Sequence, residues 1–104
     1  MTRRETPLHL PYEGPPNDEA VASVAYWYGR GCSLSVAARL AGCNPKAVRS
    51  WMREGKAADL KKRNDGRLTG SESAMRRARK TLRAARKAFL ATLITNAKKG
   101  STER

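Results

Sequence analysis

The stretch from Ser33 to Gly55 most constrains what this chain can fold into, because it has the pattern of two short helices joined by a tight turn. Gly42 follows an alanine-rich segment, and the residue just past a helix end often takes a positive φ that glycine adopts without strain. Asn44 is suited to cap a second helix, and Pro45 is tolerated at the first helical position. The stretch therefore predicts a helix-turn-helix motif.

The second helix of this motif has one apolar face and one polar face. Val48 and Trp51 recur at helical spacing and are expected to face the core. In proteins that use the motif, the second helix lies in the major groove of DNA. A helix pair that binds nothing would share the apolar spacing, so the polar face is what favours DNA binding. The candidate DNA-binding residues here are Asn44, Lys46, Arg49, Ser50 and Arg53.

The charge of the chain points the same way. It has 22 Lys and Arg against 9 Asp and Glu, a net charge of +13, which indicates a polyanionic partner such as nucleic acid or an anionic membrane surface. No apolar run approaches the roughly 18 residues that a membrane span requires. The first residues also lack the apolar core of a signal peptide. We therefore expect a cytoplasmic protein that binds double-stranded DNA and no membrane.

The pattern along the chain predicts an all-α fold, in which an N-terminal three-helix helix-turn-helix domain is followed by a long basic C-terminal helix. A helix beginning after Asn17 would supply the third helix of the domain. A three-helix unit of this size is marginal alone, so the rest of the chain or other copies should add stability. The predicted parts are a flexible arm (1–16), the DNA-binding domain (17–55), a polar linker (56–70), the basic amphipathic helix (71–99) and a tail (100–104).

The predicted C-terminal helix has two faces with different chemistry. Apolar side chains recur at alternating spacings of three and four, which is typical of a seam between helices of an oligomer. This seam consists of Met75, Ala78, Leu82, Ala85, Phe89 and Leu93. Between Arg76 and Lys87 no residue is acidic, and the basic side chains there form a second face, which we expect to contact DNA phosphates. They include Arg76, Arg79, Lys80, Arg83, Arg86 and Lys87. The sequence leaves three alternatives for this helix: it contacts DNA, it contacts other copies of the chain, or it does both.

Catalytic signatures are missing from the sequence. His9 is the only histidine and lies among prolines, and Gly55-Lys56 lacks the rest of a phosphate-binding loop. Cys32 and Cys43 are expected to be reduced thiols, because nothing in the sequence indicates secretion. A zinc site needs four ligands, and these two cysteines and one histidine are too few. We therefore expect no enzyme activity, no cofactor and no metal.

The motif and its setting resemble the small subunit of phage terminases, the recognition component of viral DNA packaging. The similarity covers roughly residues 33–90 and includes a polar stretch with Gly70 and a long alanine-rich helix. It rests on Ala37, Ala38, Ala41, Gly42, Asn44, Pro45, Val48, Trp51 and Gly55. The resemblance implies a ring-forming homo-oligomer that presents DNA to a large subunit, the ATPase and nuclease. It also implies that Lys46, Arg49, Ser50 and Arg53 face DNA.

Two other functions use the same features. A dimeric transcriptional regulator, or an excision or transposition accessory factor, would use the same helix on a palindromic site whose halves lie about one helical turn apart. A structural compactor of nucleic acid would depend on the basic C-terminal helix alone. Subunit number separates the ring from the dimer, and sequence dependence separates both from the compactor.

Overall fold

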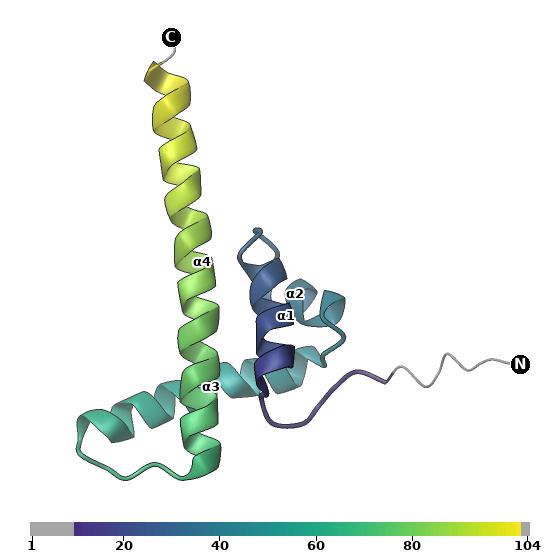
Figure 1. Cartoon of the computed structure of the whole chain (residues 1–104), viewed down its shortest axis with the longest axis vertical. Coiled ribbons are helices and arrows are strands. Elements are labelled where there is room, and N and C mark those ends of the chain that lie inside the picture. Colours follow the sequence, from purple (N-terminus) through teal and green to yellow (C-terminus); the bar gives the residue numbers. More distant parts are fainter. Residues whose placement is uncertain (1–9, 103–104) are drawn as a thin grey trace, which may run out of the picture.

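The computed structural model describes residues 10–102 and is all-helical there. Its four helices are α1 (Asp18–Tyr28), α2 (Leu34–Leu40), α3 (Pro45–Arg63) and α4 (Gly70–Thr102) (Figure 1). Within the described residues the only β-type pairing is an isolated bridge between Tyr12 and Cys43. The predicted all-α class is confirmed.

Side-chain caps fix the starts of the first three helices. The Asn17 side chain accepts a hydrogen bond from the Ala20 N–H at 2.8 Å, and the Ser33 hydroxyl accepts one from Val36. The Asn44 side chain accepts one from the Lys46 N–H at 2.9 Å, with Pro45 next to it at the first helical position. The predicted caps at Asn17 and Asn44 are therefore confirmed.

The turn between α2 and α3 depends on Gly42, whose φ is +78°. Its N–H donates to the Arg39 carbonyl oxygen at 3.0 Å, so the turn closes directly onto the end of α2. Three residues after α2 ends at Leu40 are enough to reverse the chain before the Asn44 cap. The positive φ predicted for this glycine is confirmed.

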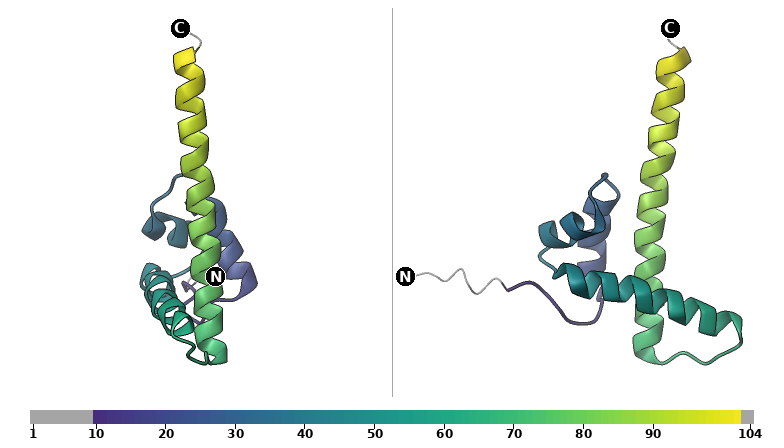
Figure 2. Two further views of the ribbon diagram at one scale, coloured as in Figure 1. Left: turned by 90° about the vertical axis from the view of Figure 1, so that its left-hand side faces the viewer. Right: turned by 180° about the vertical axis from the view of Figure 1, so that it is seen from behind.

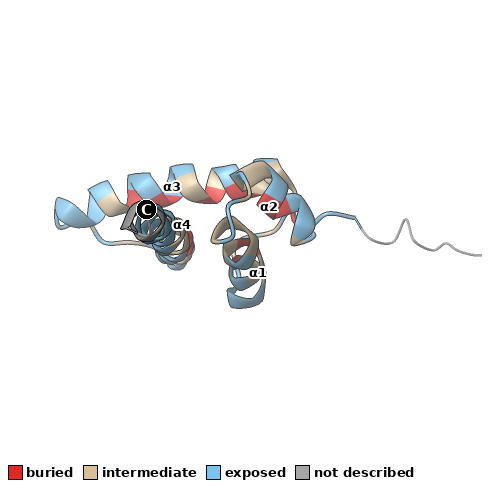
Figure 3. Cartoon of the chain, turned by 90° about the horizontal axis from the view of Figure 1, so that it is seen from above, coloured by how far each residue is buried: buried red, intermediate tan, exposed pale blue. Residues whose placement is uncertain are grey.

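The helices are arranged around α3. Figure 3 shows α1 and α4 on the same side of α3, and Figure 1 shows α4 crossing α3 and rising well beyond the other helices. The two further views in Figure 2 agree that the C-terminal part of α4 projects alone. The N-terminal half of α4 therefore belongs to the packed domain, and its C-terminal half extends from it.

All four helices supply the core. Val24 of α1, Ala38 of α2, Trp51 of α3 and Leu82 of α4 are all buried in one cluster. The expectation that the rest of the chain stabilises the three-helix unit is met by α4, which closes the core from one side. The predicted domain of residues 17–55 is therefore not a separate unit, because α4 is part of the same core.

The predicted linker is shorter in the structure. Residues 56–63 continue α3, so only six residues, 64–69, connect it to α4. Ala58 is buried, and Asp59 bonds to α4, which keeps this part of α3 packed. The predicted boundary at Gly55 was wrong because Gly55 lies at a helix crossing and does not end a helix. At the other end, α4 continues past the predicted limit of residue 99 to Thr102.

Part of the predicted flexible arm is held in place. The Tyr12 N–H donates to the Gly42 carbonyl oxygen at 2.8 Å, and the Asn44 N–H donates to the Tyr12 carbonyl oxygen at 2.9 Å. The indole N–H of Trp51 also donates to the Gly14 carbonyl oxygen at 3.2 Å. Residues 10–16 are therefore anchored to the turn and to α3, while residues 1–9 of the predicted arm lie outside the described residues.

Candidate nucleic-acid interface

The first half of α3 presents a basic face to solvent. Lys46, Arg49 and Arg53 are exposed on the side opposite the buried Val48 and Trp51, as their helical spacing predicts. Beyond Gly55 the helix is covered on one side by α4. Lys46, Arg49 and Arg53 therefore form the exposed basic face of the N-terminal half of α3.

Hydrogen bonds order the polar side chains of this face. An Arg49 guanidinium N–H donates to the Ser35 hydroxyl of α2 at 2.7 Å, which connects the two helices. The Ser50 hydroxyl donates to the Glu54 carboxylate at 2.6 Å. Glu54 lies beside Ser50 on the same part of the helix and was not among the predicted site residues. Asn44 uses its side-chain oxygen as the cap, so only its amide N–H groups remain for another partner.

Two arginines of α4 are paired within the chain. Arg76 Nε donates to Asp59 Oδ1 at 2.7 Å, and an Arg79 guanidinium N–H donates to Asp59 Oδ2 at 2.5 Å. The sequence shows no acid among these basic residues on their own helix, but α3 supplies one from across the helix crossing. Both therefore help to fasten α4 onto α3, and their predicted contact with DNA phosphates stays a prediction.

Arg86 is likewise engaged within the chain. Its guanidinium donates to the Cys32 carbonyl oxygen at 2.5 Å and stacks on the Tyr28 ring, with 4.1 Å between the guanidinium carbon and the ring centroid. The Phe89 ring lies 5.6 Å away on the same measure. Arg86 therefore connects α4 to the end of α1 and to the loop that follows it, and its predicted contact with DNA stays a prediction.

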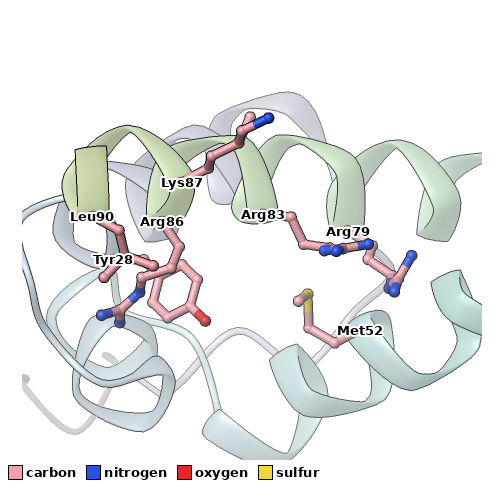
Figure 4. Close-up of a pocket in the computed structure, with 8 residues that line it drawn as sticks. Tyr28, Met52, Arg79, Arg83, Arg86, Lys87 and Leu90 are labelled. Atoms are coloured by element: carbon pink, nitrogen blue, oxygen red, sulfur yellow. The ribbon is translucent and has the colours of Figure 1, made fainter.

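Arg83 and Lys87, together with Arg79 and Arg86, line an open groove between α4, the end of α1 and α3. We call this depression of about 690 Å³ the α4 groove. Figure 4 shows basic side chains along α4, with Tyr28 and Met52 facing them from the other two helices (Figure 4). The groove is lined by Tyr28, Met52, Arg79, Arg83, Ala84, Arg86, Lys87 and Leu90.

The α4 groove is continuous with the basic face of α3. Arg79 lines the groove and also a neighbouring hollow of about 350 Å³, together with Arg53 and Lys56 of α3. Arg83 lines the groove and a third hollow that includes Lys80. Among the predicted residues, the structure thus brings Arg53 of α3 beside Arg79 of α4.

Most of the predicted oligomerisation seam packs within the chain instead. Ala78 and Leu82 are buried, and Met75 packs against them. A Cβ atom on Gly29 would lie 3.4 Å from the Ala85 Cβ, and one on Gly31 only 2.8 Å from the Phe89 ring, so these two face α1 and its following loop. The heptad spacing is real, but α1 and α3 occupy this face. Of the six residues, only Leu93 is left exposed, next to the exposed Leu90 and Ile94.

The described residues contain no group of three or more His, Cys, Asp or Glu side chains placed to hold a metal ion. Both thiols are free, and burial raises the pKa of Cys43 above its ordinary value. No helix within residues 10–102 has the length and apolar character needed to cross a membrane.

Since no protein-family model, curated protein or solved structure matches the chain, the function proposed below rests on the surface just described.

Proposed function

We propose that this protein binds double-stranded DNA in a sequence-dependent manner, with α2 and α3 acting as a helix-turn-helix and α3 as the reading helix. The observation that carries the proposal is the exposed basic face of Lys46, Arg49 and Arg53. It lies on the N-terminal half of α3, and Arg53 at its end shares a hollow with Arg79 of α4. In helix-turn-helix proteins the N-terminal residues of the second helix contact base edges.

The two parts of the basic surface would have different roles. Side chains of α3 enter the major groove, where each base pair has a distinct pattern of donors and acceptors. Lys80 of α4 is exposed and lines the third hollow but not the α4 groove, and it would meet phosphates beside the site that α3 reads. The base contacts supply specificity, and the phosphate contacts supply affinity and position.

The resemblance to phage terminase small subunits extends this proposal to a biological role. The protein would form a homo-oligomer that recognises viral DNA for packaging and presents it to a large ATPase and nuclease subunit. It would act inside the bacterial host and carry out no catalysis itself. The competing role is a dimeric regulator or accessory factor with the same reading helix. Native mass in the presence of one specific duplex distinguishes a ring from a dimer.

Selection from a randomised pool of duplexes tests the DNA proposal directly. The selected duplex and a scrambled version are then compared by fluorescence anisotropy. We expect Arg53→Ala to reduce the discrimination between them by about 1–3 kcal/mol, as for loss of a good base contact. Lys80→Ala should weaken both duplexes about equally, with a smaller salt dependence, because each phosphate contact contributes about −0.9 to the log–log slope.

Arg77→Ala is the matched control, since it removes the same charge from an exposed position of α4 outside the groove. If Arg53→Ala and Arg77→Ala cause equal losses on both duplexes, α3 is not the reading helix. If no duplex is enriched from the pool, sequence-dependent binding itself is wrong.

A further inference from the structure

We propose that the α4 groove receives the acidic segment Glu13–Glu19 of a second copy of this chain, so that copies associate head to tail. The inference rests on the homo-oligomer of the proposed function and names the two surfaces that would meet. DNA reading by α3 does not depend on it, so the two proposals can fail separately.

The chemistry of the groove defines what fits it. Four cationic residues line it, and none of the described residues lining it is acidic. Arg79 is paired with Asp59 and Arg86 is held by the Cys32 carbonyl, so Arg83 and Lys87 carry the charge still open to a partner. Buried Arg86 Nε has no hydrogen-bond partner among the described residues. The groove therefore suits an anionic ligand.

The floor of the groove favours a polypeptide over a DNA backbone. Tyr28, Met52 and Leu90 give it an apolar surface beside the cations. A run of phosphates would satisfy the cations and leave this surface uncovered, whereas a protein segment with carboxylates and an apolar side chain would cover both.

The chain itself has a segment of this chemistry. Residues 10–29 contain three acidic residues, Glu13, Asp18 and Glu19, and no Lys or Arg. All three are exposed, and Leu10, three residues before Glu13 in the chain, is 81% exposed. The hydrogen bonds from Tyr12 to Gly42 and from the Tyr12 hydroxyl to the Pro15 carbonyl oxygen hold the segment in shape. Binding a segment that is already ordered costs less conformational entropy.

The acidic segment and the groove lie on different sides of α4. Asp18 shares a hollow with Arg77 and Thr81 of α4, whereas the groove is lined by Arg79, Arg83 and Lys87. With 3.6 residues per turn, these two sets point away from each other. The acidic segment of one copy is therefore available to the groove of the next. A contact between two different surfaces joins copies head to tail, which gives a ring if the rotation closes and a filament otherwise.

Two charge-reversal variants of the full chain test the contact. The acidic variant carries Glu13→Lys and Glu19→Lys, and the groove variant carries Arg83→Glu and Lys87→Glu. Native mass spectrometry and sedimentation follow assembly without DNA. We expect the wild-type protein to associate at low salt and to dissociate as salt screens the contact. Each variant alone should associate at least about tenfold more weakly than the wild type, because like charges then face each other.

Mixing the two variants is the decisive measurement. In the mixture, the new lysines of the acidic variant face the new glutamates in the groove of the groove variant. The unchanged groove of the acidic variant faces the unchanged acidic segment of the groove variant. We expect the mixture to regain wild-type mass. Asp65→Lys and Lys62→Glu are controls at exposed positions outside both surfaces and should assemble like the wild type. Circular dichroism checks folding, and Glu13→Gln with Glu19→Gln replaces the acidic variant if its helices are lost.

Three outcomes would overturn the contact: a wild-type monomer at every salt concentration, an acidic variant that assembles normally, or a mixture that stays dissociated. If only the groove variant changes, and it loses affinity for all duplexes, the groove belongs to DNA. In each of these cases, the proposed function stays supported if the acidic variant still binds the selected duplex more tightly than the scrambled one.

Discussion

Gly55 of α3 lies against the backbone of Met75 in α4, so closely that a Cβ atom on Gly55 would come 2.5 Å from the Met75 carbonyl oxygen. The same atom would lie 2.8 Å from the Arg79 Cβ. The crossing of the two helices therefore depends on a missing side chain. This close approach also brings Arg79 beside Asp59, one turn further along α3.

We expect Gly55→Ala to destabilise the protein, because α4 would have to move away from α3. Overpacking of this kind costs roughly 1–3 kcal/mol, against a gain in helix propensity of about 1 kcal/mol or less. Gly70→Ala is the control, since nothing lies within 4 Å of its added Cβ. Urea unfolding followed by circular dichroism gives both values. Equal stability of the two variants would mean that the crossing is looser than the structure has it.

The sequence predicted well those features that depend on neighbouring residues. The caps at Asn17 and Asn44 and the positive φ of Gly42 are local signals, and all three are present in the structure. One local signal was misread. The last helix was expected to begin at residue 71, but Thr69 and Glu72 cap each other reciprocally and α4 begins at Gly70.

Features that depend on distant residues could not be predicted from spacing. Asp59 is 17 residues from Arg76, and the partner of Arg86 is the backbone carbonyl of Cys32, which has no sequence signature. The heptad spacing of the last helix predicts that an apolar face is covered, but not by what. Here the cover is the chain's own α1 and α3, which leaves most of the seam unavailable to other copies.

Asp59→Asn should lower stability and tighten binding to DNA. The change weakens the bonds to Arg76 and Arg79, and because these groups are partly exposed the loss should be about 1 kcal/mol. Two arginines beside the basic face of α3 would then be free for phosphates. Asp65→Asn removes the same charge from an exposed turn, where φ is +60° and asparagine is well tolerated. Unfolding and DNA titrations of both variants separate the pairing from net charge, and equal DNA affinity of the two would contradict this account.

Glu72 gives the start of α4 a dependence on pH. The Thr69 backbone N–H, and then Lys61, hold the pKa of this carboxyl below its ordinary value of 4.5. A lowered pKa in the folded state means that the carboxylate stabilises the protein above pH 4.5 and that this contribution disappears as the pH falls through the lowered pKa. Wild type should therefore be more stable than Glu72→Gln at neutral pH, with the difference shrinking in acid.

Urea unfolding at several pH values measures that difference. Asp65→Asn is a control at an exposed position outside any helix, and it tests whether loss of a negative charge alone has the same effect. A stability difference between wild type and Glu72→Gln that does not change with pH would show that the carboxylate form contributes nothing to the cap.

Substitutions at Gly42 measure the effect of backbone strain apart from that of packing, at the turn between α2 and α3. Its φ is +78°, and nothing lies within 4 Å of an added Cβ, so a substitution there meets strain without steric contact. We expect Gly42→Val to lose roughly 1–3 kcal/mol, as for a β-branched residue forced into this region, and Gly42→Asn to lose less. Gly70→Val adds the same side chain in open space without a positive φ. Because the Gly42 carbonyl also accepts the Tyr12 N–H, a shifted turn should loosen the segment that bonds Trp51. Trp fluorescence should therefore change in Gly42→Val alone, and a Gly42→Val variant as stable as Gly70→Val would place the strained position elsewhere.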